Sequence, residues 1–179
     1  MNPGLLAGAL DARNELFDAR HEAAFRLFNG FTEGWPSLAV DLYAQTLVLH
    51  DYSETPETNL STIAAAQEFY QSRLPWLSAV LLKTRNAKTP EARNGVLLHG
   101  EKLSTKIREH GVWYSVALQM NRDASFYLDT RNLRSWILQN LAGQRVLNTF
   151  AYTGSLGVAA MAAGASRVVH LDLNRRFLN

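Results

Sequence analysis

The residues with the clearest capacity for chemistry lie between Arg145 and Asp172, in the stretch RVLNTFAYTGSLGVAAMAAGASRVVHLD. A short apolar run enters a group of turn-forming residues, an alanine-rich run of high helical propensity follows, and a β-branched run ends at Asp172. The expected order is therefore strand, turn, helix and strand. In such a unit the helix N-terminus lies beside the end of the first strand, and an acidic residue about 20 positions on bonds a ribose. This spacing predicts a site for a nucleoside-containing ligand, although an ordinary unit of this kind without a ligand also fits the pattern.

The elements that must position this site are expected to be strands at 145–148 and 167–171 and a helix at 156–163. Gly164 follows that helix, at the position where a helix commonly ends. The turn itself reads VLNTFAYTG from Val146 to Gly154. It resembles the first motif of class I S-adenosylmethionine (SAM) methyltransferases, and most closely the branch of ribosomal RNA methyltransferases related to the large-subunit cytosine-5 enzymes.

The turn departs from the general class I pattern, because Phe150 and Tyr152 occupy two places where most of these enzymes have glycine, and only Gly154 remains. That departure is typical of the branch. It also disfavours a dinucleotide site, because a tyrosine would crowd a pyrophosphate that needs close approach of the backbone. The resemblance thus implies SAM as the cofactor, bound in a Rossmann-like domain.

A second motif, FYLDTRNLR, spans residues 126–134 and resembles the family segment F-F-L-D-x-R-x-x-R, which leads into the first helix of the methyltransferase domain. Its aromatic pair would cover an adenine or pack in the core, and Asp129 would cap a helix that starts near Thr130. Arg131 would contact the SAM carboxylate, pair with a carboxylate side chain or remain at the surface. The family has Lys-Thr-Gly before the aromatic pair, whereas this chain has Asp-Ala-Ser at 123–125.

The resemblance implies that backbone N–H groups near Gly154 meet the methionine carboxylate, that Asp172 accepts both ribose hydroxyls, and that Asn148 replaces an acid found in many class I enzymes. No catalytic residue is assigned and no metal site is predicted. The complete set of predicted cofactor-binding residues is Asn148, Phe150, Ala151, Tyr152, Thr153, Gly154, Asp172, Phe126, Asp129 and Arg131.

The family's later Asp-Pro-Pro motif and a catalytic cysteine are both absent from these 179 residues. We therefore expect the front part of a longer enzyme, with little or no methyl transfer of its own. The predicted fold class is α/β, with a small α+β domain of helices and antiparallel hairpins at 1–118 and the start of a Rossmann-like SAM methyltransferase domain at 119–179.

Within the first part, a helix is expected over Leu10–Leu27 and another over Leu60–Leu74, which Pro75 would end. Strands are expected at 38–43, 46–50, 78–84 and 95–99, with a further hairpin at 103–117. The first of these strands matches the family pattern P-x-L-x-V-D-x-Y. Its Asp41 is not proposed as catalytic.

Charge is unevenly distributed along a chain whose net charge is only +2. Residues 1–72 carry 3 Lys or Arg against 10 Asp or Glu, whereas residues 73–134 carry 11 against 5 and residues 135–179 carry 4 against 1. The basic half would suit a polyanion such as RNA, and the resemblance implies ribosomal RNA, although solvated surface strands would give the same pattern.

The absence of cysteine fits a reducing compartment, and neither a signal peptide nor a membrane span is recognisable, so we expect a cytoplasmic protein. Two other functions stay open. One is an RNA-binding module without catalysis, and the other is a nicotinamide-dinucleotide-binding Rossmann protein.

Overall fold

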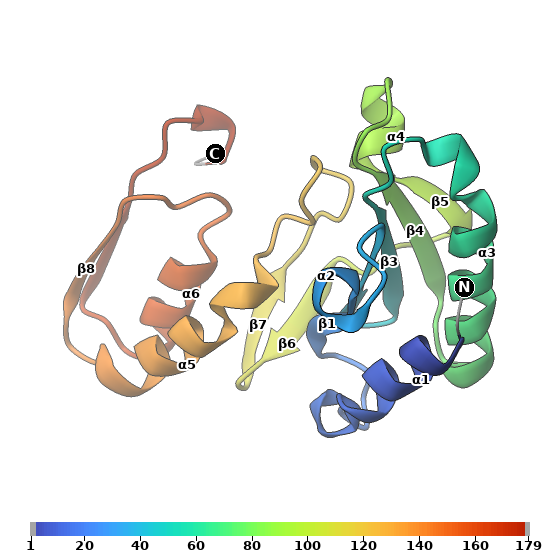
Figure 1. Cartoon of the computed structure of the whole chain (residues 1–179). Coiled ribbons are helices and arrows are strands. Elements are labelled where there is room, and N and C mark those ends of the chain that lie inside the picture. The colour runs from blue at the N-terminus through green and yellow to red at the C-terminus, as the bar shows by residue number, and fades with distance from the viewer. Residues whose placement is uncertain (1–2, 178–179) are drawn as a thin grey trace.

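The computed structural model describes residues 3–177, and a five-stranded sheet forms the N-terminal part of this range (Figure 1). Neighbouring strands pair antiparallel except for β3 and β4, which are parallel because helix α3 carries the chain back across the sheet. The strands in spatial order are β1 (Ala24–Asn29), β2 (Leu38–Tyr43), β3 (Thr46–Asp51), β4 (Ala79–Thr84) and β5 (Val96–His99).

One face of this sheet is covered by α1 (Pro3–Asp11) and α3 (Leu60–Arg73), which bury an apolar core between helices and strands. Leu42 and Leu49 point into this core from the strands, and Tyr70 meets them from α3. Two shorter helices, α2 (Gly30–Glu33) and α4 (Pro90–Asn94), lie in connections between strands.

The opposite face is covered by a hairpin of β6 (Lys106–Glu109) and β7 (Val112–Ser115) and by the segment that follows it. Figure 1 shows this hairpin between the five-stranded sheet and the C-terminal part of the chain. Its turn places His110 and Gly111 at φ 50° and 82°, as expected for residue types that tolerate the left-handed region. Because both faces are covered, every residue of β2 and β3 is buried.

The C-terminal part consists of α5 (Arg131–Asn140), β8 (Arg145–Asn148), α6 (Ser155–Ala162) and β9 (Arg167–His170). Strands β8 and β9 pair in parallel, and α6 connects them. The predicted order of strand, turn, helix and strand is therefore confirmed, as is the α/β fold class.

A buried ion pair attaches α5 to the hairpin. Arg134 donates from Nε and Nη2 to the two carboxylate oxygens of Glu109, and neither side chain has any exposed surface. The guanidinium also lies 4.0 Å from the centroid of the Phe126 ring, so the charge is covered by an aromatic face.

The predicted helix over Leu10–Leu27 was wrong. The chain leaves α1 at Asp11, makes a short 3₁₀ turn at Asn14–Leu16 and enters β1 at Ala24. From residue 18 onward, the Asp18 carboxylate accepts hydrogen bonds from the backbone N–H groups of residues 20, 22 and 23 and so closes a turn in place of a helix.

The predicted cap at Asp129 was also wrong. A 3₁₀ turn spans Leu128–Thr130, and the N-cap position of α5 is Thr130, which makes no side-chain capping bond. The hydroxyl of Thr130 instead donates to the carbonyl of Tyr127.

Every helix within residues 3–177 is too short or too polar to span a lipid bilayer.

Candidate functional site

The loop between β8 and α6 carries the first motif, and hydrogen bonds fix its path. The N–H of Ala151 donates to the carbonyl of Leu171, and the N–H of Leu171 donates to the carbonyl of Asn148. Gly154, at φ 83°, is the N-cap of α6, and its N–H donates to Ala151. The loop is therefore laid against the end of β9, beside the first turn of the helix.

Tyr152 adopts φ 47°, in the left-handed region that residues other than glycine rarely occupy. Its side chain compensates for this unusual conformation, because the hydroxyl exchanges hydrogen bonds with the Asn121 side chain over 3.0–3.2 Å. The ring packs against Tyr127, with 4.9 Å between centroids, and against Phe177 at 4.6 Å. The tyrosine thus connects the motif loop to residues that precede α5.

Asp172 lies just past the end of β9, and its carboxylate closes the same loop. Oδ2 accepts the backbone N–H of Tyr152 at 2.8 Å, and Oδ1 accepts that of Asn174 at 2.8 Å. These two backbone donors lower the pKa of Asp172, so the carboxylate is ionised at neutral pH. Each oxygen retains a second lone pair that can accept a hydroxyl from a ligand.

Four other predicted residues also lie in this loop. Asn148 is buried at the end of β8, with its side-chain nitrogen 3.4 Å from Nδ1 of His170. Ala151 is buried, and the hydroxyl of Thr153 donates to the carbonyl of Ser125. Phe150 is 87% exposed, so its ring is open to a ligand.

The three residues predicted from the second motif lie outside that loop. Phe126 is 3% exposed and packs in the core against Tyr114. Arg131 pairs with the carboxylate of Glu109 at 3.3 Å, which is one of the roles considered for it. Asp129 is exposed and lines a different cavity.

That cavity, of about 340 Å³, lies between the five-stranded sheet and residues 123–129. Its floor contains Arg26, whose Nε and Nη2 donate to the Asp41 carboxylate at 2.8 and 3.1 Å. Nε2 of His50 lies 3.0 Å from the same carboxylate. On the rim, Arg85 and Asp123 form an ion pair at 3.6 Å.

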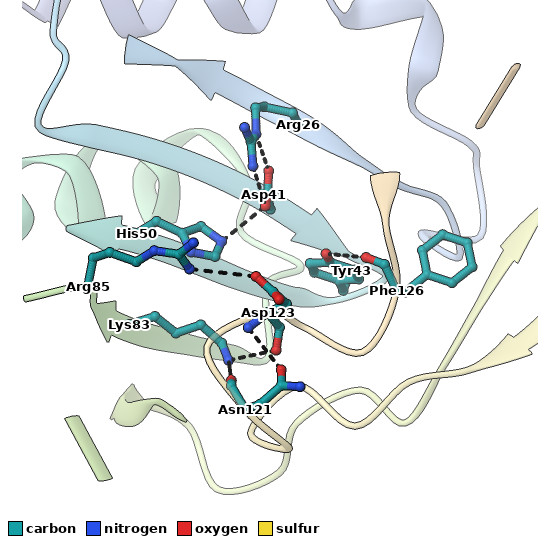
Figure 2. A network of polar contacts seen from close by, with 9 residues as sticks. All are labelled: Arg26, Asp41, Tyr43, His50, Lys83, Arg85, Asn121, Asp123 and Phe126. Carbon is teal, nitrogen blue, oxygen red and sulfur yellow. Dashed lines mark hydrogen bonds and ion pairs between the residues drawn. The ribbon is translucent and has the colours of Figure 1, made fainter. Parts of the chain in front are cut away.

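Burial alone would raise the pKa of Asp41, but the hydrogen bonds and charges of His50 and Arg26 outweigh it and lower the pKa to about 2. Lys83 lies on the neighbouring strand and donates to the backbone carbonyls of Asn121 and Asp123. Burial lowers the pKa of Lys83 to about 8, with Asp123 opposing the shift. The lysine therefore fixes the wall of the cavity to β4 (Figure 2).

Sequence reasoning did not identify this cavity, although a signal was present. Arg26, Asp41, His50 and Lys83 each interrupt a strand that is otherwise mainly apolar. A polar residue at a buried strand position requires a partner, and four such positions on successive strands indicate a shared polar site. Among residues 3–177, no group of three metal-ligating side chains is close enough together to hold a metal ion.

A family model described as S-adenosylmethionine-dependent methyltransferase matches residues 25–179. The chain therefore belongs to the SAM-dependent methyltransferases, as the first motif indicated.

Two curated relatives make the resemblance more specific. Ribosomal RNA large subunit methyltransferase K/L of Colwellia psychrerythraea is 32% identical over 164 residues, covering 87% of this chain and 22% of that protein. Ribosomal RNA large subunit methyltransferase I of Aeromonas salmonicida is 30% identical over 173 residues, covering 96% and 43%. The chain spans less than half the length of these relatives.

Among solved structures, SMU.776 complexed with SAH superimposes with a TM-score of 0.83 at 24% identity. The match covers 98% of this chain and 44% of that one, and it establishes a shared fold.

Proposed function

We propose that this chain binds S-adenosylmethionine at the loop between β8 and α6 and serves the methylation of a base in RNA, with ribosomal RNA as the substrate. The observation that carries the proposal is the position of Asp172. Its ionised carboxylate lies past the end of β9 and is held by the N–H of Tyr152 in the motif loop. A ribose beside this loop could donate hydrogen bonds to the Asp172 carboxylate, because each of its oxygens still has a free lone pair.

The residues present fit the cofactor. Asp172 would accept the ribose hydroxyls, and the first turn of α6 after Gly154 offers backbone N–H groups to the methionine carboxylate. Asn148 adds hydrogen-bonding capacity without a negative charge. SAM supplies a methyl group that its own sulfonium already activates, so the work of these residues is to bind and orient.

RNA as the substrate is supported by the names of the two relatives and by a second groove, of about 530 Å³. Lys102, Lys106 and Trp113 line it, and the Lys106 ammonium lies 4.4 Å from the Trp113 ring centroid. Trp113 is 42% exposed. An exposed aromatic ring among cations is typical of surfaces that bind single-stranded nucleic acid.

The same proposal assigns residues 119–179 to the start of the methyltransferase domain and residues 1–118 to a preceding domain that contacts RNA. An enzyme of this kind would work in the cytoplasm, where its substrate is found.

Calorimetric titration of the purified protein with SAM, S-adenosylhomocysteine and NAD tests the cofactor. We expect binding of the first two and none of NAD. Asp172→Ala should weaken SAM binding at least tenfold, because charge-assisted hydrogen bonds to the ribose are lost. Asp172→Asn should also weaken it while preserving an acceptor for the N–H of Tyr152, and the distant exposed substitution Asp11→Ala should have no effect.

Two outcomes would contradict the proposal. Binding of NAD with no affinity for SAM would indicate a dinucleotide site. Salt-sensitive RNA binding without any affinity for SAM or S-adenosylhomocysteine would indicate an RNA-binding module alone.

A further inference from the structure

The polar residues beneath the cavity form a row across four strands. Arg26 is directly opposite Asp41 in the β1–β2 register, and His50 is directly opposite Lys83 in the β3–β4 register. Alternation along each strand sends their neighbours into the helix-covered core, so the row occupies the face of the sheet that the hairpin and residues 116–126 cover. The row therefore lies at the boundary between the sheet and the segment leading to the methyltransferase motifs.

The charges of the cavity nearly balance. Arg26 and Arg85 oppose Asp41 and Asp123, and Asp129 adds a third carboxylate. Both arginines are already paired with these carboxylates. A phosphate would meet carboxylates as well as cations, whereas a neutral group with donors and acceptors along one edge would find partners of both kinds.

The cavity also has flat aromatic walls. Tyr52 and Tyr127 line it, and the Arg85 guanidinium lies 5.8 Å from the centroid of the Tyr52 ring. Tyr127 is 43% exposed. Proteins recognise single-stranded RNA by stacking unpaired bases on tyrosine rings or guanidinium planes and by bonding the base edges.

The cavity adjoins the loop proposed for SAM. Tyr127 forms part of its wall and packs against Tyr152 of that loop. Asn121 bonds the Tyr152 hydroxyl on one side and receives the Lys83 ammonium at its carbonyl on the other. A ligand in the cavity would therefore lie close to the motif loop, as an acceptor of the methyl group must.

We infer that this cavity receives one unstacked nucleobase of the substrate RNA, stacked against Tyr52 and hydrogen-bonded by the Arg26–Asp41–His50 group. This inference rests on the proposed function, which identifies the bound nucleic acid as the substrate RNA. It assigns substrate recognition to the sheet, which precedes the SAM motif in the chain.

Fluorescence anisotropy with labelled short single strands of RNA tests this inference. The probes are homopolymers of each base and a strand of equal length and charge whose nucleotides are abasic. Base-bearing RNA should bind about tenfold or more tightly than abasic RNA, since stacking contributes strongly at each base. Tyr52→Ala should reduce this difference several-fold, because one of the stacking surfaces is lost, whereas Tyr52→Phe should preserve it.

Two further variants locate the effect. Asp41→Asn should reduce the preference for base-bearing RNA, because it removes the charge that orders Arg26 and His50. Lys102→Met, in the other groove, should weaken base-bearing and abasic RNA alike and so retain the preference, because it removes a charge and no aromatic ring.

The inference is overturned if abasic RNA binds as tightly as base-bearing RNA, or if Tyr52→Ala leaves the preference intact. Competition by inorganic phosphate that Tyr52→Ala removes would instead indicate an anion site and would equally overturn it. Titration of each variant with S-adenosylhomocysteine keeps this test separate from the proposed function, because Tyr52 lies outside the predicted cofactor residues.

Discussion

Two buried carboxylates of this protein, Glu109 and Asp41, each accept two hydrogen bonds from an arginine, yet their surroundings differ. Glu109 and its partner Arg134 have no exposed surface, and the Phe126 ring covers the guanidinium. Asp41 is buried too, but its partner Arg26 is 40% exposed and lines a cavity. The first pair is sealed from water, and the second borders a space that a ligand can enter.

This difference separates attachment from recognition. A sealed ion pair has no access to water, so removing one partner leaves a charge without compensation and the elements it joins lose their connection. A pair that borders a cavity can be partly resolvated, and its remaining hydrogen-bonding capacity is available to a ligand. The same residue types thus connect α5 to the β6–β7 hairpin at one place and prepare a polar floor at the other.

The largest effect is expected at the sealed pair. Arg134→Met should lower the free energy of unfolding by about 3–5 kcal/mol, because Glu109 would remain buried with its principal partner removed. Urea denaturation followed by circular dichroism measures this value. Arg131→Met is the matched control, since Arg131 contacts the same carboxylate from a more exposed position, and it should cost about 1 kcal/mol or less. Equal losses for the two variants would contradict the distinction between sealed and open pairs.

The sequence predicted the elements whose signals are local. The strands at 38–43 and 46–50, the helix ending before Pro75 and the β8–α6–β9 unit all follow from periodicity, β-branched runs and turn residues. The motif loop was predicted for the same reason, because its signature is contiguous in the chain. The cofactor roles assigned to its residues stay predictions.

Features that depend on distant partners were not predicted. The apolar spacing after Leu10 fits a helix, and only the contacts of the Asp18 carboxylate with the backbone reveal a turn. Likewise Arg26 and Asp41 are separated in sequence and meet only through strand register. Periodicity along one segment does not show which strand lies beside it. The cavity could therefore be identified only from the structure of the assembled sheet.

Lys83 differs from both ion pairs. It is only 2% exposed, but its ammonium donates to backbone carbonyls and not to a carboxylate. Its pKa of about 8 lies below the ordinary value of 10.5. Below pH 8 Lys83 is charged in both the folded and the unfolded state, and burying that charge lowers the free energy of unfolding by the full amount. Between pH 8 and 10.5 Lys83 is mostly neutral in the folded state but still protonated in the unfolded state. Stability contributed by this residue should therefore rise with pH across that interval.

The comparison of wild type with Lys83→Met isolates this contribution, since other groups titrate equally in both proteins. We expect the unfolding free energy of the wild type, relative to that of Lys83→Met, to increase by about 2 kcal/mol between neutral pH and pH 10. Urea denaturation at a series of pH values gives this difference. A constant difference would mean that the Lys83 ammonium is not destabilised by its burial.

A small loss of stability, similar to that of Arg131→Met, is expected at the open pair. Arg26→Met should lower the free energy of unfolding by only about 1 kcal/mol, because His50 continues to contact the Asp41 carboxylate and the cavity admits water. Arg108→Met is the matched control, because Arg108 is 39% exposed and pairs with Glu22 at 3.7 Å outside this cavity.

The two variants should be similar in urea denaturation and should differ in anisotropy with RNA. Only Arg26→Met should reduce the preference for base-bearing over abasic strands, since only Arg26 belongs to the proposed base site. If Arg26→Met instead destabilised the protein as much as Arg134→Met, the Arg26–Asp41 pair would be a structural ion pair like Arg134–Glu109. Its position beside the cavity would then not support a role in binding RNA.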